Sequence, residues 1–113
     1  MGALFAQSYY DRDEPREKEI REIAVELYRR VDWNWLQQNK PLVSMGWFPE
    51  SGFIKHDWMG YNEAMMLYVL ALGSPTHPVS PDAWQVWART YNDDWGVYLG
   101  QEFLVFGPMF GHQ

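Results

Sequence analysis

The sequence predicts a mainly α-helical chain with short β-hairpins, contained in one domain. Before Val31, apolar residues recur at intervals of three and four, as in a helix with one buried face. An unbroken apolar run at residues 64–72 lies between Asn62 and Gly73, which are typical helix-end residues. Two further segments, rich in strand-forming residues, are each interrupted by a turn that contains glycine. At 113 residues the chain suits one domain and is short for two.

Two helices are expected in the first third of the chain. Residues 3–11 have apolar side chains spaced for helical turns. We expect the second helix to have Asp11 or Asp13 as N-cap, Pro15 in its first turn and its end near Val31. Its apolar stripe comprises Ile20, Ile23, Ala24, Leu27, Tyr28 and Val31. Its charged, solvated face is expected to form the i,i+4 pairs Glu14–Lys18, Glu17–Arg21 and Glu26–Arg30.

A hairpin and an apolar helix are expected next. Residues 42–56 have strand-forming residues on both sides of a turn at residues 49–52, where proline and glycine supply the turn dihedrals. The third helix should begin at Asn62 as N-cap and end at Gly73. It is apolar on every side, which is typical of a helix buried all round. A chain of this length has few elements to surround it, so this helix indicates that the sequence is part of a larger structure.

A fourth helix and a second hairpin are expected toward the C-terminus. Ser80 is a suitable N-cap with Pro81 at the first helical position. One face of this helix should carry Trp84, Trp87, Ala88 and Tyr91. Residues 95–106 are expected to form the second hairpin, with Gly100 in its turn.

Charge and cysteine content argue against several function classes. Nine Lys and Arg stand against fifteen Asp and Glu, so nucleic acid is not an expected partner. The absence of cysteine excludes disulfides, thiolate metal sites and cysteine nucleophiles. His56, His77 and His112 are too far apart in the sequence to suggest a metal site, and no cofactor motif occurs. No membrane contact is expected, because the longest apolar run is far below the ~20 residues that a bilayer requires and no signal peptide is recognisable.

Aromatic side chains are unusually frequent, with seven Trp, seven Tyr and six Phe. Two interpretations remain open. The rings form an aromatic-rich core or interface, or some of them are stacking platforms for a ligand with a flat apolar face, such as a sugar. Residues 41–113 are acidic as well as aromatic, which suits neutral or cationic polyhydroxylated ligands better than phosphorylated ones.

Three carboxylates are candidates for chemistry. Glu63 lies in the first turn of the apolar helix, a few residues after Trp58 and Tyr61. It is either a charge that complements the helix dipole or a catalytic acid. Asp57 and Glu50 lie in loops, where a carboxylate commonly contacts only solvent or backbone amides.

Several segments resemble the glucoamylase-like domain of bacterial proteins, a family that includes β-1,2-glucan-active glycoside hydrolases and a domain of cyclic β-1,2-glucan synthases. The segments are GWFPESGF at 46–53, WMGYNEAMMLYVLALGSPTHP at 58–78 and FGPMFGHQ at 106–113, and LYRRVDWNW at 27–35 is similar too. The resemblance extends over nearly the whole chain. It implies that residues 1–113 are a slice of an (α/α)6 barrel that lacks both the N-terminal and the C-terminal parts of that domain.

The resemblance also implies a function, that of an inverting β-glucan glycoside hydrolase. Glu63, in the motif Gly60-Tyr61-Asn62-Glu63, would be the general acid. The base would lie outside this slice, so the 113-residue chain would be inactive by itself. Sugar rings of a β-glucan oligosaccharide would stack on Trp47, Trp58, Tyr61 and Trp95, and polar contacts would come from Asp57, His112 and Gln113. No metal or cofactor is implied.

Alternatives remain open at this point. The chain could be a non-catalytic glycan-binding or assembly module, in which Glu63 is structural. It could also belong to the transglycosylase domain of a cyclic glucan synthase, which would use the same site with water excluded. The apolar helix at 62–72 is expected to favour self-association. The family implies a periplasmic or secreted bacterial parent protein.

Overall fold

The computed structural model describes residues 1–105, and its architecture is mainly helical with two short antiparallel strand pairs, as the sequence predicts. In chain order the elements are α1 Gly2–Tyr9, α2 Pro15–Arg30, α3 Trp33–Gln37, β1 Trp47–Phe48, β2 Gly52–Phe53, α4 Ala64–Leu72, α5 Ala83–Arg89, β3 Trp95–Tyr98 and β4 Gln101–Leu104. The last residue of the expected second hairpin, at position 106, lies outside the described residues. Within residues 1–105, no helix has the length and apolar character that crossing a membrane requires.

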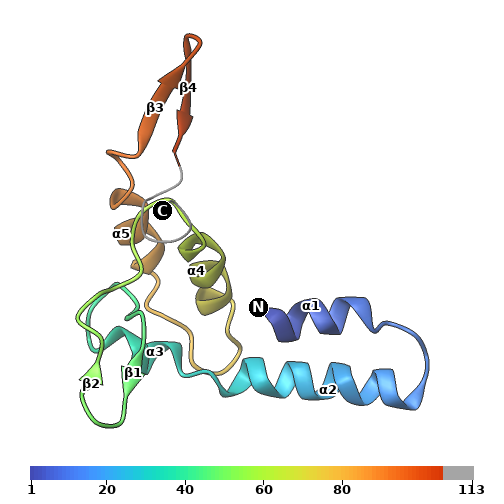
Figure 1. Ribbon diagram of the computed structural model, residues 1–113. Coiled ribbons are helices and arrows are strands. Elements are labelled where there is room, and N and C mark those ends of the chain that lie inside the picture. The colour runs from blue at the N-terminus through green and yellow to red at the C-terminus, as the bar shows by residue number, and fades with distance from the viewer. Residues whose placement is uncertain (106–113) are drawn as a thin grey trace.

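Helices α1 and α2 form an antiparallel pair that extends away from the other elements (Figure 1). Side chains of α2 hold the turn between them. Arg21 donates to the carbonyl oxygens of Tyr10 at 2.6 Å and Arg12 at 3.0 Å. The Arg12 amide in turn donates to the Glu17 carboxylate at 2.8 Å. The connection between the two helices is thus fixed to Glu17 and Arg21 of α2.

The expected N-cap and ion pairs of α2 are wrong. Glu14 occupies the cap position, and its side chain makes no capping hydrogen bond within the described residues. Asp11 and Asp13 are exposed, and the turn is held by Arg21 and Glu17 instead. Arg21 binds main-chain oxygens rather than Glu17. The ion pair that does form along α2 is Lys18–Glu22 at 3.9 Å, an exposed contact of the kind that adds little stability.

The core is built around α4. Ala64, Tyr68 and Ala71 of this helix have no exposed surface. They belong to a buried cluster completed by Trp33, Val43, Val79, Ala83 and Trp87. The other face of α4 is not covered within residues 1–105, and Met65, Met66 and Val69 are 36%, 40% and 50% exposed. The helix that is apolar on every side is therefore buried on one side.

The overall dimensions agree with incomplete burial. The radius of gyration is 16.9 Å, whereas a compact domain of this length would have about 13 Å. On α2, Ile23 and Leu27 of the predicted apolar stripe are each 48% exposed, and only Ala24 is fully buried. The part of the chain that the structure describes therefore presents apolar faces on both α2 and α4.

The ends of α4 and α5 are set by side chains near the predicted caps. Asn62 is not the N-cap of α4, because Glu63 occupies that position, but the Asn62 Oδ1 accepts from the Ala64 amide at 2.9 Å beside it. Ser80 is not the N-cap of α5, because that helix begins two residues later than expected, after Asp82. Ser80 binds the Gln37 side chain instead, through its hydroxyl at 2.9 Å and its amide at 3.0 Å.

Both predicted hairpins form. In the first, Trp47 pairs with Phe53 and Phe48 with Gly52, whose φ of 77° suits glycine. In the second, Leu99 and Gly100 connect the strands with φ values of 50° and 76°, as a two-residue type I′ turn requires. The hairpins lie at opposite ends of the α3–α5 body (Figure 1).

The Tyr68 hydroxyl joins three separate segments inside the core. It accepts a hydrogen bond from the Val43 amide at 2.9 Å and donates one to the Trp58 carbonyl at 2.9 Å. Burial raises the pKa of Tyr68 to about 12, and the Asp57 carboxylate also raises it, while the bond from Val43 acts in the opposite direction. The neutral hydroxyl is therefore the form that the folded chain favours.

Replacing Tyr68 by Phe should lower the free energy of unfolding by about 1–3 kcal/mol, because a buried amide and a partly buried carbonyl lose their partner. Urea unfolding followed by tryptophan fluorescence measures this change. Tyr98→Phe, at an exposed position on β3, is the matched control. An unfolded tyrosine ionises near pH 10, so the wild type should also lose stability as the pH rises from about 10 to about 12. The Tyr68→Phe variant should lack this part of the loss, and equal curves for both proteins would contradict the assignment.

Candidate functional site

The segment that precedes α4 is irregular in backbone but firmly bonded by side chains. The Gly60 amide donates to Thr90 Oγ1 at 2.7 Å, and the Gly60 carbonyl accepts from Trp87 Nε1 at 3.1 Å. The Tyr61 amide donates to Asp94 Oδ2 at 3.0 Å. Asn62 Nδ2 donates to the Met59 carbonyl at 2.8 Å. This segment, residues 59–62, is therefore held by α5 and the turn after it.

Glu63 follows this segment and occupies the N-cap position of α4. Its carbonyl oxygen accepts from the amides of Met66 at 3.1 Å and Leu67 at 3.3 Å, so its main chain is fixed by the helix. Its side chain is partly exposed and makes no capping hydrogen bond within residues 1–105. A partly exposed carboxyl group on a fixed backbone is able to approach a ligand at this end of α4.

Asp57 and Trp58 have structural contacts of their own. Asp57 forms an isolated antiparallel bridge with Ser44 and an ion pair with Lys40 Nζ at 3.2 Å. The Trp58 amide donates to the Val43 carbonyl at 2.8 Å, and its half-buried ring packs against the core. Both residues therefore stabilise the path of the chain that leads to Glu63.

Trp47 belongs to an exposed aromatic group on the first hairpin. Its ring is 45% exposed and lies edge-on to Trp35, with ring centroids 5.9 Å apart. Trp35 is also 48% exposed and packs on Phe53 at 4.6 Å. The sequence interpretation did not single out Trp35 and Phe53. The pairing of Phe53 with Trp47 across the predicted hairpin would have been the signal for Phe53.

The remaining predicted aromatic residues lie toward the second hairpin. Tyr61 is partly buried and lies edge-on to Tyr91, with centroids 5.9 Å apart. Trp95 begins β3 and is 57% exposed. Because the two hairpins lie at opposite ends of the body, Trp47 and Trp95 do not belong to one contiguous aromatic surface (Figure 1). The structure thus groups Trp58, Tyr61 and Glu63 in one segment and places Trp47 apart from Trp95.

Two of the predicted ligand-binding residues lie outside the part of the chain that the structure describes. His112 and Gln113 lie outside residues 1–105. Glu50, the other carboxylate considered, is exposed in the turn between β1 and β2. Within the described residues, no group of three or more His, Asp or Glu side chains is arranged to hold a metal ion.

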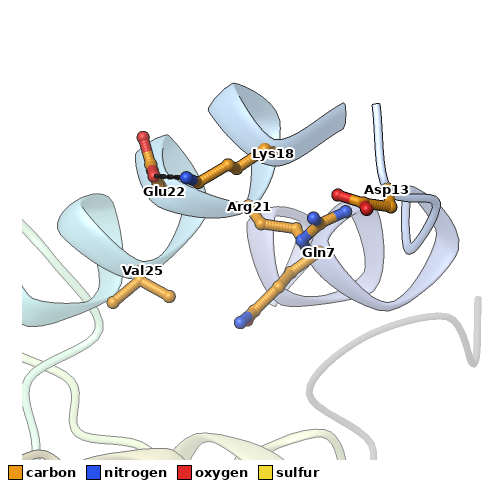
Figure 2. Close-up of a pocket in the computed structure, with 6 residues that line it drawn as sticks. All are labelled: Gln7, Asp13, Lys18, Arg21, Glu22 and Val25. Atoms are coloured by element: carbon orange, nitrogen blue, oxygen red, sulfur yellow. Dashed lines mark ion pairs between the residues drawn. The ribbon is translucent and has the colours of Figure 1, made fainter. Parts of the chain in front are cut away.

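A cavity of about 580 Å³ lies between α1 and α2, away from these residues. It is lined by Gln7, Asp13, Lys18, Arg21, Glu22 and Val25 (Figure 2). Both cationic residues of this lining already have partners, since Lys18 pairs with Glu22 and Arg21 binds the turn that precedes α2. A smaller polar cavity of about 330 Å³ includes Lys40, the partner of Asp57. Neither cavity is lined by Glu63 or by the predicted aromatic platforms.

Comparison with known proteins supplies the family. Residues 55–113 match the family Glycoamylase, described as "Putative glucoamylase". A curated relative, the exo β-1,2-glucooligosaccharide sophorohydrolase (non-reducing end) of Parabacteroides distasonis, is 32% identical over 106 residues. That alignment covers 85% of this chain and 15% of the relative, so the chain spans about a seventh of the relative's length.

Two solved structures have the same arrangement over nearly all of this chain. The β-1,2-glucanase from Parabacteroides distasonis is 26% identical with a TM-score of 0.78, covering 93% of this chain and 18% of that one. The endo-β-1,2-glucanase from Chitinophaga pinensis, solved as a sophorotriose and glucose complex, has a TM-score of 0.80 at 23% identity, covering 96% of this chain and 27% of that one. The second likeness concerns the fold alone.

The sequence resemblance is thus confirmed. The matched region 55–113 contains the Gly60–Glu63 motif, α4, α5 and the second hairpin, which is more than half of the chain. The curated relative and the solved structure from Parabacteroides distasonis are both named as enzymes that act on β-1,2-glucans. The chain belongs to the Glycoamylase family of glucoamylase-like proteins.

Proposed function

We propose that this chain is part of a β-1,2-glucan hydrolase, with Glu63 as its general acid. The observation that carries the proposal is the position of Glu63. It lies at the start of α4, partly exposed, on a backbone fixed by Asn62, Trp87, Thr90 and Asp94. The names of the relatives support the substrate class.

The proposed reaction is an inverting hydrolysis. Glu63 would protonate the oxygen of the departing sugar, directly or through a substrate hydroxyl. A second carboxylate would activate water on the opposite face of the sugar ring, with the two carboxyl groups ~6.5–9.5 Å apart. We propose that this base belongs to the remainder of an (α/α)6 barrel of which residues 1–113 form a slice. The extended shape, with a radius of gyration of 16.9 Å, supports this arrangement.

The substrate contacts follow the same proposal. Tyr61 and Trp58 lie shortly before the acid in the sequence and would contact the sugars on either side of the cleaved bond. Trp95 and Trp47, on the two hairpins, would contact more distant sugars. His112, Gln113 and Asp57 would add hydrogen bonds to sugar hydroxyls.

A non-catalytic glycan-binding module is the second candidate. The observation that favours it concerns Asp57, the nearest carboxylate before Glu63 in the sequence. Asp57 is already paired with Lys40, so it is not a free second carboxylate for Glu63. In such a module the exposed rings of Trp35 and Trp47 would bind sugar. Glu63 would only complement the dipole of α4 at the start of that helix.

The 113-residue chain produced by itself should release no reducing ends from β-1,2-glucan, because an acid without its base loses one of the two proton transfers that make hydrolysis fast. A reducing-end assay with the wild type and Glu63→Gln measures this. Absence of turnover in both is the expected result. Turnover that disappears in Glu63→Gln would show that the chain contains its own base and would contradict the slice.

Binding of sophorotriose to the chain should be weak, insensitive to salt and dependent on indole rings. Ring contacts are apolar, whereas exposed charge interactions are screened within ~8–10 Å at physiological ionic strength. Trp47→Ala should weaken binding by about two- to tenfold. Glu50→Ala, in the turn of the same hairpin, should leave it unchanged.

A fluorescence titration at low and high salt tests this prediction, with cellotriose as the control for linkage. Preference for sophorotriose supports a β-1,2-glucan site. A steep loss of affinity with salt, or equal affinity in Trp47→Ala, would contradict the stacking assignment.

We also propose that the chain self-associates through the exposed face of α4, since uncovered apolar patches promote association. A symmetric dimer is the expected form. Met66→Glu should shift the population to monomer in sedimentation velocity, and Val97→Glu, on the exposed hairpin β3–β4, should leave the dimer intact. A wild-type monomer that binds no apolar dye would refute the proposal.

A further inference from the structure

We infer that Asp94 is a positioning residue, which holds Tyr61 and Glu63 in place and connects them to the hairpin that carries Trp95. The inference rests on the proposed function, because it concerns the geometry of the same site. Asp94 lies in the short connection between α5 and β3, and the sequence gives no sign that it reaches the segment before α4.

The first observation is the bond to Tyr61. Asp94 Oδ2 accepts from the Tyr61 amide at 3.0 Å, across 33 positions of sequence. A carboxylate acceptor makes this a charge-assisted bond, which is stronger than one between neutral groups. The acceptor acts on the main chain two residues before Glu63, so it sets the path by which the chain enters α4.

The second observation is the close approach of the same carboxylate to Gly60. Gly60 has φ of 81°, a conformation that other residues rarely adopt. A Cβ atom built at this position would lie 3.5 Å from Asp94 Oδ2. The carboxylate therefore packs along the Gly60 backbone while it binds Tyr61, and the left-handed turn brings the Tyr61 amide to it.

The third observation is that the Asp94 backbone is fixed on both sides. Its amide donates to the Tyr91 carbonyl at 3.0 Å, and its carbonyl accepts from the Val105 amide at 2.7 Å. The second bond closes the open end of the β3–β4 hairpin, directly beside Trp95. One residue thus joins the end of α5, the Trp95 hairpin and the segment that contains Tyr61.

The neighbouring carboxylate provides a matched control. Asp93 is exposed, whereas Asp94 is partly buried. Replacing Asp93 changes the same charge at almost the same place but removes no hydrogen bond to Tyr61. A general electrostatic effect on the site would appear in both variants, and a positioning effect only at Asp94.

The test compares Asp94→Ala, Asp94→Asn and Asp93→Ala in the 113-residue chain. Amide hydrogen exchange at Tyr61 should become about tenfold faster in Asp94→Ala, because the amide loses a charge-assisted partner. Asp94→Asn retains an oxygen acceptor and should recover most of the protection. Asp93→Ala should match the wild type. Exchange at Ala71, in the core, should not change in any variant.

Sophorotriose titration of the same proteins links the geometry to the proposed function. Asp94→Ala should bind about tenfold more weakly than the wild type, with Asp94→Asn intermediate. If the wild type binds no sophorotriose, the substrate contacts proposed for the 113-residue chain are wrong, while exchange at Tyr61 still decides the positioning role. Unchanged exchange at Tyr61 in Asp94→Ala, or equal acceleration at Ala71, would overturn the inference.

Discussion

The structure depends on one buried hydroxyl group. Tyr68 lies on the buried face of α4, and its hydroxyl joins this helix to the main chain at Val43 and at Trp58. Neither segment is part of a regular sheet, so the amide and carbonyl have no ladder partner at these points. Because an unpaired buried polar group is costly, the two bonds fix where both segments cross the helix. The bond from Tyr68 to the Trp58 carbonyl therefore fixes the start of the segment that leads from Trp58 to Glu63.

Side-chain hydrogen bonds also hold other irregular segments of the chain. Gln37 binds Pro41 and Ser80, Asn62 binds Met59 and Ala64, and Trp87 binds the Gly60 carbonyl. Side-chain amides, hydroxyls and an indole thus replace the hydrogen bonds that a helix or a sheet would supply. This gives one physical answer to the high aromatic content. Tyr68 and Trp87 combine core volume with a polar group that anchors a loop, whereas Trp47 and Trp95 remain exposed.

Local patterns predicted most of the elements, and long-range contacts decided the site. Four helices and both hairpins follow from apolar spacing and turn residues, and Gly52 and Gly100 lie in the expected turns. Helix α3, Trp33–Gln37, was not predicted. The N-cap of α2 was wrong because Arg21 binds the preceding turn, an alternative partner that a capping pattern does not include. Asp94 was missed for a similar reason. In the sequence it is an ordinary loop carboxylate, and its bond to the Tyr61 amide is seen only in the folded chain.

The unpaired indole of Trp33 is a further observation that bears on the proposed slice of a larger fold. Trp33 is 9% exposed, and within the described residues its Nε1 is buried without a hydrogen-bond partner. The residue also lines a cavity of about 180 Å³ with apolar side chains that include Leu4, Leu27 and Leu70. A desolvated N–H without an acceptor costs about 1–3 kcal/mol, so burial at Trp33 is favourable only where other contacts offset that cost. An added helix that brought an acceptor to Nε1 and apolar side chains to Leu27 would remove the cost and cover the exposed stripe of α2. The slice proposal therefore accounts at once for the unpaired indole, the apolar faces and the extended shape.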